Sequence, residues 1–202
     1  MTRMFAASLF VFCVFAWGAI RFPHEMKNRR KNRVTVSHVD RRERIVLFIS
    51  LAGLGLIPIA YTVSMAIRDG RGILSSADWG FSPTLAIFGL FVWIGALWLF
   101  YATHRQLKRN WSQTLELREG HTLVTDGVYT LVRHPMYTAF FLWGVAQAFM
   151  LQNWIAGLAG IVGFGTLYLT RVNREEAMMR EAFGTQYDSY VERTKRIVPY
   201  LH

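Results

Sequence analysis

Residues 81–103 read FSPTLAIFGLFVWIGALWLFYAT, a run of 23 residues without a charged side chain. A second run of the same length and character covers residues 45–67. About 20 apolar residues in a helix span the hydrocarbon core of a bilayer, which is roughly 30 Å thick. Each run therefore predicts a transmembrane helix.

Three more apolar segments accompany these two runs. Residues 4–20 are not followed by a small-residue cleavage site, which predicts a retained first helix rather than a signal peptide. The apolar region 136–170 is interrupted only by Gln152 and Asn153, which divide it into segments 136–152 and 154–170, each close to the shortest length that crosses a bilayer. The sequence thus predicts an all-α polytopic membrane protein of about five transmembrane helices, the last two forming a C-terminal helical hairpin, within a single domain of residues 1–202.

The overall composition agrees with a membrane protein. Hydrophobic residues make up 52% of the 202-residue chain and charged residues 18%, too few to cover a water-soluble globule of this size. The formal net charge of +10 is carried between the apolar runs, which favours contact with anionic membrane lipids over nucleic-acid binding. The single cysteine, Cys13, lies within an apolar run, so the sequence has no zinc motif and predicts no metal site.

The distribution of Lys and Arg predicts the orientation of the helices in the membrane. Nine such residues lie between positions 21 and 44, two between 68 and 80, five between 104 and 133, and six from 171 to the end. Short cytoplasmic loops are enriched in these residues. The N-terminus is therefore expected outside and the polar C-terminal region in the cytoplasm, which would place a bacterial protein in the inner membrane.

A polar segment precedes the fourth apolar run and ends in Arg133-His134-Pro135. Proline disfavours a helical conformation in the residue before it and suits the first position of a helix. Arg133 and His134 are thus expected at the mouth of a helix, whose free N–H groups and dipole attract anions. The alternative is that both side chains only reach to the membrane interface and that Pro135 only begins a helix.

The segment after the last apolar run places charges of both signs near this helix mouth. Glu176 and Arg180 match an ordinary surface ion pair by their spacing, and Gly184 predicts the end of the helix. Four further residues share one face of that helix: Arg171, Arg174, Glu175 and Met178. Beyond it the sequence predicts an amphipathic cytosolic tail that lies against the headgroups with Tyr187, Tyr190, Val198 and Tyr200.

Together these motifs resemble the superfamily of isoprenylcysteine carboxyl methyltransferases and phosphatidylethanolamine methyltransferases, which are integral membrane enzymes. The resemblance covers the chain from Gly127 to Pro199, and the order and spacing of the motifs agree throughout. The matching pieces are Gly127-Val128-Tyr129, Arg133-His134-Pro135-Met136-Tyr137, Arg171, Glu175-Glu176, Phe183-Gly184, Tyr187, Tyr190 and Arg196-Ile197-Val198-Pro199.

The resemblance implies a cofactor, a site and a source for the methyl acceptor. S-adenosyl-L-methionine would bind in a cytosol-facing pocket within residues 124–199, and a lipid-like or prenylated acceptor would arrive from the bilayer. Arg171 and Glu175 would be the catalytic residues, nearer the acceptor. The cofactor would be held by Tyr129, Arg133, His134, Pro135, Tyr137 and Glu176.

The chemistry of these residues fits the division into an acceptor side and a cofactor side. The cofactor carboxylate suits the helix mouth at Pro135 and its ammonium suits Glu176, while transfer from its sulfonium depends mainly on positioning. Arg171 could orient an acceptor carboxylate, whereas an amine acceptor would need Glu175 to take a proton. The class of acceptor, whether carboxylate, amine or thiol, stays open.

Two other functions fit parts of the pattern. Membrane sterol reductases also contain R-H-P-x-Y, so an NADPH-dependent reductase of a conjugated lipid is one alternative. A non-enzymatic membrane scaffold, in which the polar cluster only anchors the tail, is the other. An enzyme requires that His134 meet the carboxylates of Glu175 and Glu176 in one pocket.

Overall fold

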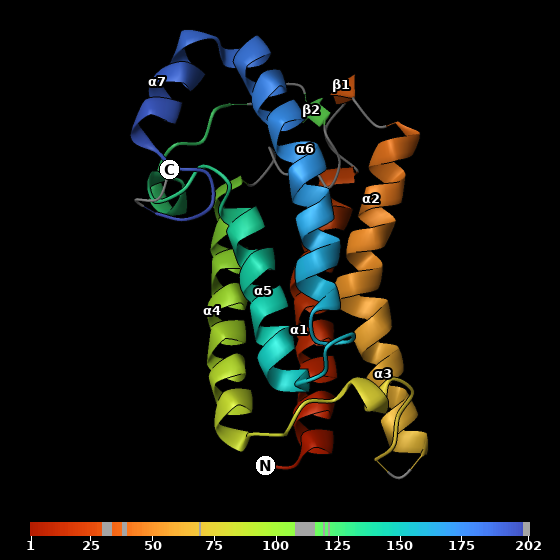
Figure 1. Ribbon diagram of the computed structural model, residues 1–202. Helices are drawn as coiled ribbons and strands as arrows, with labels where there is room; N and C mark the ends of the chain where they lie inside the picture. Colours follow the sequence, from red (N-terminus) through yellow and green to blue (C-terminus); the bar gives the residue numbers. More distant parts are fainter. Residues whose placement is uncertain are drawn as a thin grey trace.

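The computed structural model describes residues 1–29, 34–37, 40–68, 70–107, 116–118, 120 and 122–199. Tyr200, the last residue of the predicted amphipathic tail, lies outside them. Helices dominate the structure and run roughly parallel to one another (Figure 1), which confirms the predicted all-α membrane fold. The elements in chain order are α1 (Arg3–Arg29), β1 (Val34–Ser37), α2 (Arg41–Leu51), the π-helix η1 (Ala52–Leu56), α3 (Ile57–Ile67), η2 (Ser75–Ala77), α4 (Pro83–Leu107), β2 (Glu116–Arg118), η4 (Gly127–Thr130), α5 (Pro135–Leu151), α6 (Ala159–Phe183) and α7 (Thr185–Arg193).

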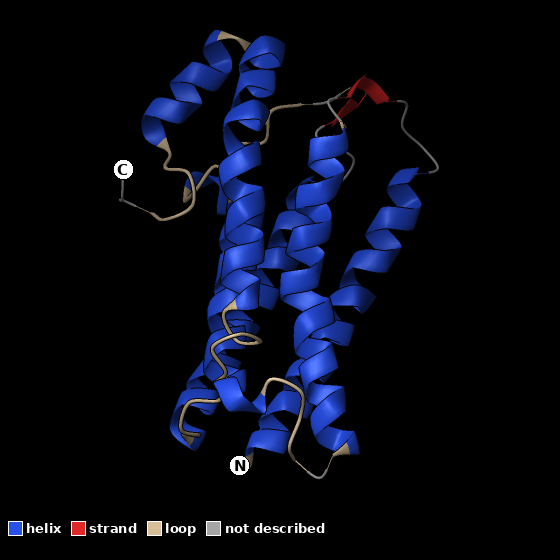
Figure 2. Ribbon diagram, turned by 45° about the vertical axis from the view of Figure 1, so that its right-hand side comes forward, coloured by secondary structure: helices blue, strands red, loops and turns tan. Residues whose placement is uncertain are grey.

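Within the described residues, three helices are long and apolar enough to cross a membrane. They are Arg3–Phe22 of α1, the continuous helix Arg41–Ile67 made by α2, η1 and α3, and α4. The helix α5 is apolar but shorter, and with α6 it forms the predicted C-terminal hairpin. Strands β1 and β2 form a small antiparallel ribbon at the end of the bundle where α7 also lies (Figures 1 and 2).

The turn of the hairpin is wider than the sequence predicts. The helix α6 begins at Ala159 rather than at residue 154. The reason is Asn153, whose Oδ1 accepts hydrogen bonds from the backbone N–H groups of Ile155 and Ala156 at 2.9 and 2.7 Å, which holds the chain in a turn. Beyond residue 170 the helix continues to Phe183, so its second half carries charged side chains out of the apolar region.

A buried polar network closes the bundle at the N-terminal end. Asp78 accepts hydrogen bonds from Tyr61 Oη at 2.6 Å and Asn153 Nδ2 at 2.7 Å, and it forms an ion pair with Arg3. These contacts tie α1, α3 and the turn of the hairpin together. The N-terminus and α7 lie at opposite ends of the bundle (Figures 1 and 2), so the polar segments of the C-terminal region are far from this network.

The helices α2 and η1 pack directly on α6 through glycines. A Cβ on Gly53 would lie 2.1 Å from the carbonyl oxygen of Ala159, and a Cβ on Gly163 would lie 2.8 Å from that of Ile49. The two backbones therefore touch, as small residues allow in membrane helices. An aromatic cluster joins α1, α4 and α5 elsewhere in the core and consists of Trp17, Trp93, Phe100, Phe140 and Trp143.

Candidate active site

The segment before α5 is held in place by the C-terminal tail. Pro135 is the first residue of α5, and His134 precedes it with φ −125° and ψ 60°, outside the helical region, as expected for a residue before proline. The backbone N–H groups of Arg133 and His134 donate to the carbonyl oxygens of Lys195 and Arg196 at 2.8 and 2.9 Å. The tail therefore returns to the mouth of α5 and fixes both side chains there.

Glu176 lies at the centre of a closed cluster of charges. Its side chain is 1% exposed. Arg133 Nε donates to Oε1 at 2.7 Å, Arg196 Nη2 donates to Oε2 at 2.8 Å, and His134 Nε2 lies 3.2 Å from Oε1. Burial raises the pKa of the Glu176 carboxyl, but the hydrogen bonds from His134, Arg196 and Arg133 outweigh burial and hold that pKa well below its usual range. The Glu176 carboxylate is therefore ionised, and both of its oxygens accept hydrogen bonds.

Glu175 forms a second, more open cluster. The hydroxyl of Tyr137 donates to its Oε2, Arg171 Nε lies 3.7 Å from the same oxygen, and His134 Nδ1 lies 3.8 Å from Oε1. The His134 ring stacks on that of Tyr137 with centroids 5.2 Å apart. Successive residues of a helix lie about 100° apart around its axis, so Glu175 and Glu176 face different partners, and the imidazole of His134 lies between them.

Arg171 joins this cluster to the N-terminal half of the chain. Its Nη1 lies 3.3 Å from Oε1 of Glu43, whose side chain is 1% exposed. Glu43 belongs to the first turn of α2, where Asp40 caps the helix by accepting the N–H of Glu43 at 2.7 Å. The guanidinium of Arg171 therefore lies between Glu43 and Glu175.

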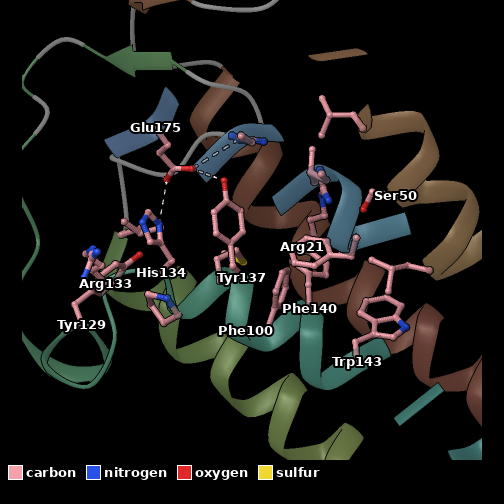
Figure 3. Close-up of a pocket in the computed structure, with 18 of the residues that line it drawn as sticks. Arg21, Ser50, Phe100, Tyr129, Arg133, His134, Tyr137, Phe140, Trp143 and Glu175 are labelled. Carbon is pink, nitrogen blue, oxygen red and sulfur yellow. Dashed lines mark hydrogen bonds and ion pairs between the residues drawn. The ribbon is translucent and has the colours of Figure 1, made fainter. Parts of the chain in front are cut away.

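A cavity of about 450 Å³ lies beside these clusters. Arg133, His134 and Glu175 lie together on one side of it, whereas the other side is mostly aromatic and aliphatic, with Arg21 and Ser50 as the polar residues labelled there (Figure 3). Tyr137 lies between the two groups, with Phe140 and Trp143 on its far side in Figure 3. One cavity therefore offers both a polar and an apolar compartment to a ligand.

Comparison with known proteins finds a family whose sequence model matches the middle and later part of the chain. Residues 87–181 match the sequence model of the isoprenylcysteine carboxyl methyltransferase (ICMT) family. This part of the chain is similar in sequence to the ICMT family. The match includes the Arg133-His134-Pro135 segment, Tyr137, Glu175 and Glu176.

Several relatives support the match. Protein-S-isoprenylcysteine O-methyltransferase B of Arabidopsis thaliana is 35% identical over 96 residues, which cover 46% of this chain and 49% of that protein. The protein-S-isoprenylcysteine O-methyltransferase of Dictyostelium discoideum is 31% identical over 140 residues, 62% of this chain and 56% of that protein. The chain thus spans about half the length of these curated relatives. The solved structure of the eukaryotic intramembrane Ras methyltransferase ICMT without a monobody is similar in fold, with a TM-score of 0.54 and 23% identity over 82% of this chain and 55% of that one.

The structure brings the predicted site residues together. His134 lies 3.8 Å from the Glu175 carboxylate and 3.2 Å from that of Glu176, so one imidazole contacts both. Glu176 differs from the other predicted residues, because it is not among the described residues that line the cavity. The predicted residues that line it are Tyr129, Arg133, His134, Pro135, Tyr137, Arg171 and Glu175.

The tyrosines of the predicted amphipathic tail pack inward rather than against headgroups. Tyr187 and Tyr190 are buried and line the cavity, and the Tyr190 hydroxyl donates to the carbonyl oxygen of Tyr129 at 2.7 Å. Burial raises the pKa of all three phenols above their ordinary value, so they stay protonated at neutral pH. The helix α7 is thus a wall of the cavity, whereas Val198 is exposed.

Sequence reasoning missed two charged residues of the site, and both lie outside the ICMT match. Arg196 was recognised only as part of the C-terminal motif, yet it binds both oxygens of Glu176. Glu43 lies in the segment between positions 21 and 44 that is rich in Lys and Arg, where the sequence predicts no site residue. The pattern Asp40-x-x-Glu43 before an apolar run could have revealed it, because an Asp followed three residues later by Glu marks the start of a helix.

Proposed function

We propose that this chain is an integral membrane methyltransferase that uses S-adenosylmethionine to methylate the carboxylate of a prenylated or similarly lipid-like acceptor. The observation that carries the proposal is the single cavity that joins the cluster around Glu175 to an apolar compartment. The printed names of the relatives, protein-S-isoprenylcysteine O-methyltransferase, support the same reaction. The ICMT match favours this function over an NADPH-dependent reductase or a scaffold.

The polar compartment fits the charges of S-adenosylmethionine. Glu175 is the one carboxylate among the described residues that line the cavity, and it lies next to the ring of Tyr137, a combination that favours a sulfonium. The mouth of α5, with Arg133 and His134, suits the cofactor carboxylate. When bound, the cofactor supplies a methyl group made electrophilic by the sulfonium.

Glu176 acts on the cofactor indirectly in this proposal. Arg133, His134 and Arg196 already contact both of its oxygens, and Glu176 is not among the described residues that line the cavity. Glu176 instead positions Arg133 and His134, and Glu175 takes the role of direct electrostatic partner. Tyr129 and Pro135 line the same part of the cavity and complete the cofactor side.

The charges that line the cavity favour an anionic acceptor. Arg21, Arg133 and Arg171 contribute three positive charges, against one negative charge from Glu175. A carboxylate is already ionised at neutral pH and needs no base to become a nucleophile, whereas an amine would have to lose a proton. Arg171 then orients the acceptor carboxylate, and Glu175 holds Arg171 and Tyr137 in place.

The acceptor enters from the bilayer beside α2. Phe48 and Leu51 line the cavity although their side chains are 62% and 54% exposed, so the apolar compartment reaches the lipid-facing surface. The distribution of Lys and Arg supports an outside N-terminus and a cytoplasmic site, and the N-terminus and α7 lie at opposite ends of the bundle (Figure 1).

A binding and transfer experiment tests the proposal. Isothermal titration of the detergent-purified chain with S-adenosylhomocysteine should show binding, and tritiated methyl groups should pass from S-adenosylmethionine to N-acetyl-S-farnesylcysteine. Two matched acceptors serve as controls: N-acetylcysteine, which lacks the apolar tail, and the farnesylated methyl ester, whose carboxylate is blocked. Absence of binding at millimolar ligand, or equal labelling of acid and ester, would refute the proposal. Protection from thermal unfolding by NADPH alone would favour the reductase.

The natural acceptor can be identified in cells. Cells with and without the chain, grown with methyl-tritiated methionine, should differ in labelled material that dissolves in organic solvent. Labelled methyl groups released by mild base would indicate an ester, whereas base-stable label would indicate transfer to nitrogen or sulfur and would contradict the carboxylate assignment.

A further inference from the structure

The cavity ends at a π-helical turn inside the membrane. Its polar end is marked by Arg171, which pairs with Glu43 at the start of α2. Along that helix the lining residues run from Leu47 to Gly55. Gly55 lies twelve residues beyond Glu43, a separation of about 18 Å at 1.5 Å per residue. Gly55 is therefore at the apolar end of the cavity, far from the charged clusters.

The backbone at this turn is fixed by its neighbours. In η1 the N–H of Ile57 donates to the carbonyl oxygen of Ala52, five residues earlier, which defines a π-helix, a feature often found at functional sites. The buried amide of Gln147 donates to the carbonyl oxygen of Gly53 at 2.9 Å and to that of Ala156 at 2.7 Å. The close contact between Gly53 and α6 holds the backbone of η1 in place as well.

Gly55 differs from its neighbouring glycines because it has room for a side chain. Cβ atoms on Gly53, Gly160 and Gly163 would meet other atoms at 2.1, 2.6 and 2.8 Å, so packing explains those three. A Cβ on Gly55 would meet only the side chain of Leu51, at 3.9 Å. Since Gly55 is buried and lines the cavity, a side chain at this position would extend into the cavity.

We infer that Gly55 sets the length of the apolar tail that the acceptor can carry. A glycine inside a helix lowers its stability by roughly 1 kcal/mol relative to alanine, and here packing does not require it. The space it leaves lengthens the apolar compartment at its far end. This inference rests on the proposed function, because it assigns the acceptor tail as the occupant of that compartment.

Substitutions of graded size test the inference. Gly55→Ala, Gly55→Leu and Gly55→Phe shorten the cavity progressively, while Gly95→Leu and Gly95→Phe on α4 are matched controls. A Cβ on Gly95 would meet no atom within 4 Å, but this glycine is exposed and does not line the cavity. Cysteine acceptors with geranyl, farnesyl and geranylgeranyl tails report the accepted length.

The expected result is a change in length preference without loss of the cofactor site. Each methylene kept out of an apolar compartment lowers affinity about fourfold, so exclusion of two lowers it about fifteenfold. Gly55→Phe should reduce kcat/KM for the longest tail by at least that factor and leave the geranyl acceptor and S-adenosylhomocysteine binding unchanged. The Gly95 variants should keep the parent preference.

Two outcomes separate this inference from the proposed function. If the parent chain methylates prenylated acceptors but Gly55→Phe lowers all tail lengths equally, or none, the assignment of Gly55 fails and the methyltransferase stands. If the parent transfers no methyl group, titration with the same acceptors still tests the inference. A shift of the preferred tail to a shorter length in Gly55→Phe supports the inference, whereas binding that does not depend on tail length overturns it.

Discussion

Replacing Glu43 by glutamine tests whether the N-terminal helices position Arg171, the residue proposed to orient the acceptor. Glu43 does not line the cavity, whereas its partner Arg171 does. The substitution keeps the size of the side chain and removes its charge. We expect Arg171 to lose its fixed orientation between Glu43 and Glu175, while the cofactor contacts around His134 stay in place.

The magnitude follows from the burial of the pair. The two side chains are 1% and 9% exposed, with Nη1 and Oε1 3.3 Å apart. Removing one partner of a buried ion pair costs about 3–5 kcal/mol, and because Glu175 remains within 3.7 Å of Arg171 Nε we expect the lower end, about 3 kcal/mol. In a chain of this size that corresponds to a loss of about 6–12 °C in Tm. Misplacement of a positioning group by about 1 Å lowers kcat by about a hundredfold.

The exposed pair on the same two helices is a matched control. Asp40 and Arg174 lie 3.1 Å apart and are 52% and 34% exposed. Asp40→Asn keeps the capping side chain, since Asn caps helices as well as Asp does, and should leave both Tm and kcat near the parent values. Steady-state methyl transfer, S-adenosylhomocysteine titration and thermal unfolding in detergent give the three readouts. A loss of Tm and kcat in Asp40→Asn as large as that in Glu43→Gln would refute the reasoning. The reasoning also fails if Glu43→Gln lowers Tm by the same amount in an Arg171→Met background, where the ion pair is already absent.

Three further outcomes are expected. Tyr137→Phe removes a hydrogen bond to the Glu175 carboxylate, worth about 1.5–3 kcal/mol, so kcat/KM should fall about ten- to a hundredfold; an unchanged rate would exclude that bond from the reaction. Because the Glu176 pKa is lowered by folding, its contribution to stability is present above the ordinary carboxyl pKa of about 4.3 and is lost as the pH falls below it. The Tm of the parent should therefore drop between neutral and acidic pH more steeply than that of Glu176→Gln, and parallel curves would contradict this. In a Cys13→Ala background, an impermeant maleimide should label Gly80→Cys in intact cells and Ser189→Cys only after permeabilisation; the reverse pattern would invert the proposed orientation.

The membrane helices could be predicted because the bilayer imposes a length and a composition. The first run, residues 45–67, lies within the continuous helix formed by α2, η1 and α3. The second run, residues 81–103, lies within α4 apart from its first two residues. The start of α2 at Arg41 was not predicted, because a search for uncharged runs ends at the first charge, whereas Glu43 is buried by pairing with Arg171. The π-turn could not be predicted either, since its partner Gln147 lies far along the chain.

The site could be predicted as a set of residues but not as a division of roles. The motif around His134 together with Glu175 and Glu176 predicts a shared pocket, and the contacts of His134 with both carboxylates agree. Only the family resemblance assigns Glu175 to the acceptor and Glu176 to the cofactor, because adjacent carboxylates carry the same chemistry. The distinction arises from the returning tail, which brings Arg196 against Glu176 and leaves Glu175 on the cavity side.

The two compartments of the cavity come from different parts of the chain, and this separates cofactor binding from acceptor choice. The polar compartment is built from residues within the ICMT match, chiefly Arg133, His134 and Glu175. The apolar compartment draws a large part of its wall from α1 and α2, which precede the matched segment. Glu43 and Gly55 lie on one continuous helix, so the same element contacts Arg171 at one end and lines the apolar compartment, the proposed place of the acceptor tail, at the other. If the proposed function holds, changes in α2 should therefore alter which acceptor is methylated, while the proposed cofactor site, anchored by Glu176 and the C-terminal tail, stays the same.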